Sequence, residues 1–201
     1  MKTFLHVGCG PKRKPQTTAA FNTKEWRELR LDIDEEASPD ILGTMTDMAL
    51  VGSESVQAIF SSHNIEHLYA HEVPQALSEF LRVLDDSGFV VLTCPDLQSI
   101  CALVAGGGLA NPAYRSPAGP ITPHDVIYGH GPHLARGKLY MAHRSGFSEQ
   151  TLRTAFESAG FASIASLCRG KAPYFDLWLL ATKRATAHDT LLSLARAHFP
   201  T

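Results

Sequence analysis

Short apolar runs alternate with a helical segment along the first half of the chain, and this alternation limits its fold more than any other feature. Runs typical of β-strands occur before residue 95, at residues 4–7, 29–33, 40–42, 56–61 and 89–94. Between the last two, apolar side chains from Val73 to Leu84 recur at three- and four-residue spacing, which predicts a helix with one buried face. Such alternation is typical of a mostly parallel sheet covered on both faces. We therefore expect an α/β fold.

The ends of two helices can be predicted from single residues. Gly88 follows the first helix and is expected to form its left-handed cap. A second helix is predicted over residues 149–159, with Ser148 as N-cap and Gly160 at its end.

The remaining apolar runs complete the sheet. Two strands are expected near residues 162–167 and 176–181, followed by an amphipathic helix over about 187–198. Together with the five earlier runs they predict a Rossmann-like, doubly wound sheet of seven mostly parallel strands.

Residues 106–145 form an irregular insertion after the fifth strand. They hold five prolines and four histidines with little periodicity. An irregular segment of this length in a compact domain is usually a functional loop. We expect a single domain, residues 1–201, in which this insertion is an ordered lid or binding region.

Composition excludes several classes of protein. The formal net charge is −2, whereas a nucleic-acid-binding protein usually carries a basic face. The four cysteines form no CxxC pair, which argues against a zinc ribbon and a thioredoxin-like motif. No stretch approaches the roughly 20 apolar residues of a membrane span. We expect a cytoplasmic protein with reduced cysteines that binds neither nucleic acid nor membrane.

A glycine turn, Gly8-Cys9-Gly10, follows the first strand directly. Glycines at this point allow a tight turn and the close approach of a ligand to the backbone. A dinucleotide site also needs a third glycine and a helix facing the pyrophosphate. Arg13 occupies the position of that glycine, and Pro11 and Pro15 interrupt the segment. The first helix is therefore expected to be short or absent, and a cofactor without phosphates, such as S-adenosylmethionine, is favoured.

Asp32 ends the second predicted strand about 20 residues after the glycine turn. In this architecture, a carboxylate at this point accepts hydrogen bonds from ribose hydroxyls. Asp32 is therefore the second candidate cofactor-binding residue.

Several segments together resemble the class I S-adenosylmethionine-dependent methyltransferases, above all the small bacterial predicted methyltransferases related to type 11. The segments that carry the resemblance are residues 5–11, 31–34, 61–68, 81–88, 93–97 and 142–147. The resemblance implies S-adenosylmethionine as the cofactor, with the methionine part beside Gly8, Cys9 and Gly10. It also implies that Asp32 binds the ribose, Ile33 packs on the adenine, and Ser61 and Ser62 border the cofactor and acceptor.

The third strand departs from the family pattern. Many relatives place an aspartate after it that reaches the adenine amine, and Thr44 aligns with that position. We expect Asp47, beside Met48, to take this role.

Methyl transfer is an in-line displacement, for which alignment matters first and a base only when the acceptor must lose a proton. His63 and His143 are the candidate catalytic residues, with His143 facing the acceptor beside Tyr128 as base or orienting group. His63, Glu66 and His67 resemble the place where some quinone-pathway methyltransferases hold a metal, but His63 replaces the first carboxylate. We expect Glu66 and His67 to be structural, and no metal site.

Two functions fit these observations. The first is methyl transfer to the oxygen or nitrogen of a small-molecule acceptor. The second is a non-catalytic protein that keeps the fold and the cofactor as a sensor or partner subunit. Apolar residues near the C-terminus suggest a homodimer surface, namely Leu191, Leu192 and Leu194.

Overall fold

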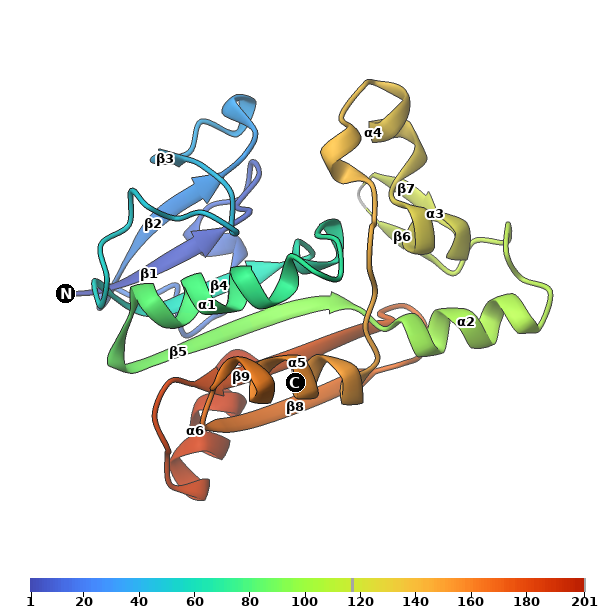
Figure 1. Cartoon of the computed structure of the whole chain (residues 1–201). Coiled ribbons are helices and arrows are strands. Elements are labelled where there is room, and N and C mark those ends of the chain that lie inside the picture. The colour runs from blue at the N-terminus through green and yellow to red at the C-terminus, as the bar shows by residue number, and fades with distance from the viewer. Residues whose placement is uncertain (117, 201) are drawn as a thin grey trace.

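The computed structural model describes residues 1–116 and 118–200, and seven strands form one sheet in the order β3-β2-β1-β4-β5-β9-β8 (Figure 1). The parallel strands are β1 (Lys2–Val7), β2 (Trp26–Asp32), β3 (Ile41–Leu42), β4 (Val56–Ser62) and β5 (Leu84–Pro95). β9 (Asp176–Thr182) is antiparallel to both β5 and β8 (Ser163–Arg169). The predicted Rossmann-like, seven-stranded and mostly parallel sheet is confirmed.

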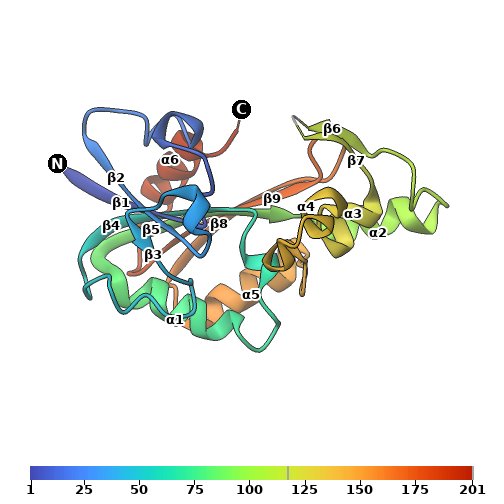
Figure 2. The same ribbon diagram turned by 90° about the horizontal axis from the view of Figure 1, so that it is seen from above.

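Helices cover the sheet on both faces, as Figure 2 shows. α1 (Val73–Val83) and α5 (Glu149–Ala159) lie on one face, and their apolar stripes enter the larger core. α6 (His188–His198) lies on the other face. This arrangement follows from strands that are apolar on both sides.

No α-helix follows the glycine turn, as the sequence predicts, and only a 3-10 turn forms at Lys14–Gln16. The aromatic ring of Phe21 instead covers this part of the sheet and stacks on Phe4, with ring centroids 4.3 Å apart. Leu191 and Leu194 of α6 pack into the same aromatic cluster. These two leucines pack within the chain itself, whereas Leu192 is partly exposed; a homodimer stays a prediction.

The ends of α5 are those predicted from the sequence, whereas the end of α1 differs from the prediction. The side chain of Ser148 accepts a hydrogen bond from the backbone of Thr151, and Gly160 is left-handed, as predicted. α1 ends at Val83, where the backbone becomes extended at once, so Gly88 lies inside β5 and is not a cap. The prediction for Gly88 was wrong because β5 begins as soon as the helix ends.

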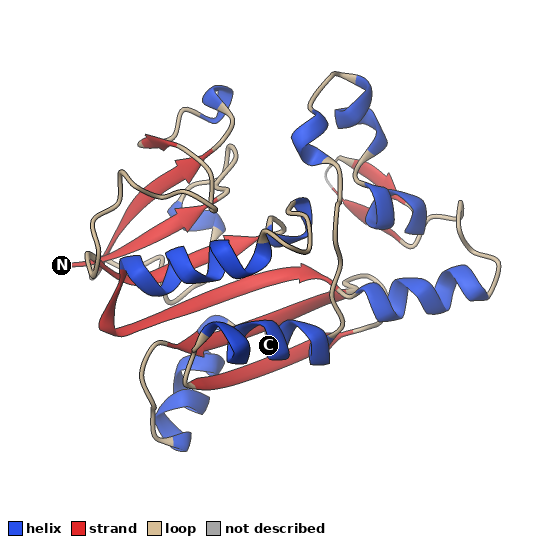
Figure 3. Ribbon diagram, in the orientation of Figure 1, coloured by secondary structure: helices blue, strands red, loops and turns tan. Residues whose placement is uncertain are grey.

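The described residues of the insertion form a mixture of short elements, as Figure 3 shows. It follows α2 (Leu97–Ala105), a helix that the sequence analysis missed because the segment shows no clear apolar stripe. The elements of the insertion are β6 (Tyr114–Ser116), β7 (Gly119–Ile121), α3 (Pro123–Tyr128), α4 (Gly131–Ala135) and a 3-10 turn (Leu139–Met141). A small core that includes Ile100 and Val126 joins the insertion to α2.

Among the residues that the structure describes, no helix has the length and apolar character needed to cross a membrane.

Buried His198 predicts a fall in stability at mildly acidic pH. Burial lowers the pKa of His198 from 6.5 to about 4, and its Nδ1 lies 2.8 Å from the hydroxyl of Thr18. Below pH 6.5 this histidine becomes protonated in the unfolded chain but stays neutral in the folded chain. The free energy of unfolding therefore decreases as pH falls toward 4. Between pH 7.5 and 5 we expect this histidine alone to reduce the free energy of unfolding by about 2 kcal/mol.

Urea unfolding at the two pH values measures this loss. His198→Gln should show a smaller pH dependence than the wild type, whereas His71→Gln, at an exposed position, should not change it. An equal pH dependence in His198→Gln and the wild type would contradict the prediction.

Candidate active site

The candidate site lies where the order of the strands reverses, between β1 and β4. Ligands of open α/β sheets bind outside the carboxyl ends of the strands at such a point. The glycine turn begins there, with left-handed backbone at Gly8 (φ +63°) and Gly10 (φ +50°). The side-chain amide of Asn64 donates hydrogen bonds to the carbonyls of Val7 (3.0 Å) and Ser62 (3.1 Å). Asn64 thus ties the ends of β1 and β4 together against the turn.

Asp32 fixes the shape of the glycine turn from the end of β2. One carboxylate oxygen accepts a hydrogen bond from the backbone N–H of Gly10 (2.6 Å), and the other accepts one from Asp34 (2.8 Å). The guanidinium of Arg30, which is buried, donates to the carbonyls of Gly10 (2.5 Å) and Ala37 (3.0 Å). The turn is therefore held in position by buried charged groups.

A two-part cleft opens beside this turn. One part, of about 270 Å³, is lined by Asp32, Ile33 and the segment 43–46. The other, of about 420 Å³, is lined by residues 8–12 together with Ser62 and His63. The two parts share five lining residues: Gly8, Asp32, Asn64, Tyr140 and Met141. The cleft thus brings together seven of the predicted site residues: Gly8, Cys9, Gly10, Asp32, Ile33, Ser62 and His63.

Three predicted cofactor residues lie outside this cleft. Ser61 is buried beneath its floor, 3.3 Å from the amide nitrogen of Asn64. The carboxylate of Asp47 accepts a hydrogen bond from the backbone of Ala49, and Met48 lies in the main core. The wall after β3 is formed instead by Thr44, Met45 and Thr46. A tight turn, bridged between Thr44 and Asp47, places Asp47 and Met48 outside the lining of the cleft; their role in cofactor binding stays a prediction.

Cys9 lines the cleft but its thiol is not activated. Burial, and next the nearby carboxylate of Asp32, raise the pKa of Cys9 to about 12. A thiol rather than a thiolate is present at neutral pH, which argues against nucleophilic chemistry at this residue.

The insertion contacts the end of β2, beside the cleft, through a polar clip that the sequence analysis missed. The ammonium of Lys138 lies 2.9 Å from Asp34 and 2.7 Å from Glu36, and the hydroxyl of Tyr140 donates to Asp34 (2.6 Å). The only sequence signal for this clip is Asp34 itself, a second carboxylate after Asp32 at the end of β2. Tyr140 and Met141 line both parts of the cleft.

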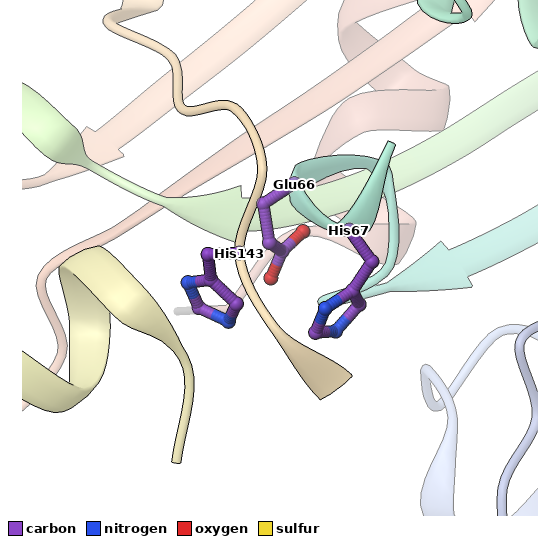
Figure 4. A group of neighbouring side chains, drawn as sticks. All are labelled: Glu66, His67 and His143. Atoms are coloured by element: carbon purple, nitrogen blue, oxygen red, sulfur yellow. The ribbon is translucent and has the colours of Figure 1, made fainter. Parts of the chain in front are cut away.

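A cluster of histidines surrounds Glu66 at the edge of the cleft, whose two parts are lined by His67 and His63 respectively. Glu66 is 1% exposed, and Figure 4 shows its carboxylate between the rings of His67 and His143. Nδ1 of His63 lies 3.5 Å from one of its oxygens. Burial raises the pKa of Glu66, but His63, His67 and His143 outweigh this effect, so that the pKa is lowered.

His63 lies between this cluster and the cleft. It lines both the larger part of the cleft and a cavity of about 140 Å³ that Glu66, His67 and His143 also line. His143 and Tyr128, paired in the sequence analysis, line one further cavity of about 280 Å³. Burial lowers the pKa of His143, which favours a neutral ring at pH 7.

Comparison with known proteins agrees with this geometry. The chain matches a family model described as a methyltransferase domain over residues 5–92. No protein of curated function matches it in sequence.

Solved structures show the same fold. A methyltransferase of Archaeoglobus fulgidus, dependent on S-adenosylmethionine, is similar over 90% of this chain and 85% of its own, with 13% identity and a TM-score of 0.59. The 1,6-didemethyltoxoflavin-N1-methyltransferase of Burkholderia thailandensis, with its substrate and S-adenosylhomocysteine bound, is similar over 91% and 71%, with 14% identity and a TM-score of 0.54. The chain therefore has the fold of the S-adenosylmethionine-dependent methyltransferases, and residues 5–92 match a methyltransferase-domain model.

Proposed function

We propose that this enzyme methylates an oxygen or nitrogen of a small-molecule acceptor, in the cytoplasm, as a single domain whose insertion is the lid. The observation that carries the proposal is the position of His63, which lines both the cleft at the glycine turn and the cavity enclosed by the insertion. A group in that position can act on an acceptor held directly beside the cofactor.

The cleft has the features that S-adenosylmethionine needs. The glycine turn leaves its backbone open to a ligand, and Asp32 has two oxygens with further lone pairs for the ribose hydroxyls. Ile33, 59% exposed, offers an apolar surface for the adenine. Lys12 lines the larger part of the cleft and is placed to pair with a carboxylate. The cofactor supplies an electrophilic methyl group on a sulfonium.

The histidines provide the acceptor side of the site. We assign His63 as the base that takes a proton from the acceptor, because it adjoins both cavities. His143 takes the role of orienting group with Tyr128, because its Nδ1 is fixed by the carbonyl of Val126 (2.7 Å). Closure of the insertion excludes water and holds the acceptor in line, and alignment of this kind is the main source of rate in a displacement.

Calorimetry followed by a turnover assay tests the proposal. We expect S-adenosylmethionine and S-adenosylhomocysteine to bind with micromolar dissociation constants, one per chain. Pools of small hydroxyl and amine compounds should then give S-adenosylhomocysteine above the background rate. Binding without turnover in every pool would favour the non-catalytic role and overturn the proposal.

A further inference from the structure

The carboxylate of Glu66 is buried with no hydrogen-bond partner among the residues that the structure describes. Nδ1 of His63 lies 3.5 Å from one of its oxygens and is an ionic partner only when the ring of His63 is protonated. A buried carboxylate without a partner is costly, and buried charges in proteins are normally paired or bound to metals. Glu66 lies in a 3-10 turn (Ile65–His67) that directs its side chain inward toward the histidines. A cation held between Glu66 and the neighbouring rings would supply the partner that a neutral His63 does not.

The two neighbouring rings are held in the manner of metal ligands. Nδ1 of His67 lies 3.1 Å from the carbonyl of Ala142, and Nδ1 of His143 lies 2.7 Å from the carbonyl of Val126. A carbonyl can only accept, so Nδ1 carries the hydrogen and Nε2 of each neutral ring keeps its lone pair. Metal-binding histidines almost always have their other ring nitrogen fixed in this way.

The three side chains also converge. One nitrogen of each ring and one oxygen of Glu66 all lie within 4.8 Å of one another. The rings themselves meet edge to face, with centroids 4.9 Å apart. We propose that Glu66, His67 and His143 bind one divalent transition-metal ion.

Two histidines and one carboxylate are the ligands of catalytic zinc sites and of non-haem iron sites, in which one or more positions stay open. All three proposed ligands line the cavity of about 140 Å³ that His63 also lines. An open position on the ion would lie in that cavity. This part of the inference rests on the proposed function: an acceptor hydroxyl bound to the ion would lose its proton more readily, because a bound cation lowers the pKa of its oxygen ligand.

A titration with metal alone tests the site apart from methyl transfer. The full chain, treated with a chelator and dialysed, is titrated with Zn²⁺ by calorimetry and with Co²⁺ by visible absorption. We expect one ion per chain with a micromolar or lower dissociation constant, and Co²⁺ bands typical of four or five ligands. Glu66→Gln and His143→Ala should each weaken binding at least about 100-fold, since either change removes one of only three ligands.

His71→Ala is the matched control, because His71 is exposed and packs on Tyr69 away from the cluster. It should leave metal binding unchanged. The binding of S-adenosylhomocysteine by each variant reports on folding and on the cofactor cleft, and it should be retained. Failure of cofactor binding in the wild type would therefore count against the proposed function alone.

The metal proposal would be overturned if the wild type bound no Zn²⁺ more tightly than about 100 μM. It would equally be overturned if folded Glu66→Gln and His143→Ala bound Zn²⁺ as well as the wild type. Should Glu66→Gln fail to fold, His67→Ala and His143→Ala carry the same test.

Discussion

Asp32→Ala should weaken the binding of S-adenosylmethionine by about 100-fold or more. A hydrogen bond to a charged group contributes about 1.5–3 kcal/mol, and the carboxylate is proposed to accept two from the ribose. It also holds the backbone N–H groups of Gly10 and Asp34, so the substitution loosens the glycine turn. Calorimetry with S-adenosylmethionine measures the effect, with circular dichroism to confirm that the sheet is intact.

Asp47→Ala is the control for this prediction. Asp47 was expected from the sequence to bind the adenine, yet it lies outside the cleft and bonds to the backbone of Ala49. Its removal should change the dissociation constant by less than about threefold. A loss as large as that of Asp32→Ala would place the adenine at Asp47 and contradict the site described above.

Gly8→Ala should destroy cofactor binding while leaving the sheet folded. The backbone at Gly8 has φ +63°, and a Cβ there would overlap the side-chain amide of Asn64. Left-handed backbone costs a residue with a Cβ about 1–2 kcal/mol, and displacing Asn64 adds the loss of its bonds to Val7 and Ser62. We expect binding at least about 50-fold weaker by calorimetry and a free energy of unfolding lower by about 2–3 kcal/mol.

Gly107→Ala separates the cost of left-handed backbone from the effect of overlap with Asn64. Gly107 has φ +85°, but a Cβ there meets no atom within 4 Å, so only the backbone cost remains. This variant should lose about 1 kcal/mol of stability and keep its affinity for the cofactor. Equal losses of affinity in both variants would show that the overlap with Asn64 is not the cause.

The parts of the fold that depend on short stretches of sequence could be predicted. The number of strands in the main sheet follows from apolar runs, and α5 follows from its stripe and from Ser148 and Gly160. The glycine turn and Asp32 could also be placed, because each lies at the end of a strand whose position the sheet fixes. The role of Gly88 was predicted wrongly because a glycine that follows a helix can either cap the helix or lie in the next strand.

The parts of the site that depend on distant contacts could not be predicted. Lys138 meets Asp34 across 104 residues, and His67 meets the carbonyl of Ala142 across 75. Nothing local to Glu66 indicates that a histidine from the insertion will lie beside it. The histidines of the insertion were therefore considered without Glu66, the group that they contact in the fold. Glu66 itself was expected to be structural because it precedes the long helix α1.

The clip between the insertion and the end of β2 bears on the timing of the reaction cycle. Tyr140 and Met141 form part of the wall of both halves of the cleft, so under the proposed function a movement of this wall would widen the exit for spent cofactor. Two of the bonds in the clip are ion pairs from a partly exposed lysine, and ion pairs that solvent reaches contribute little to stability. If the insertion is the lid, as proposed above, a weak clip of this kind would hold it over the cleft during transfer and still let it open in every cycle.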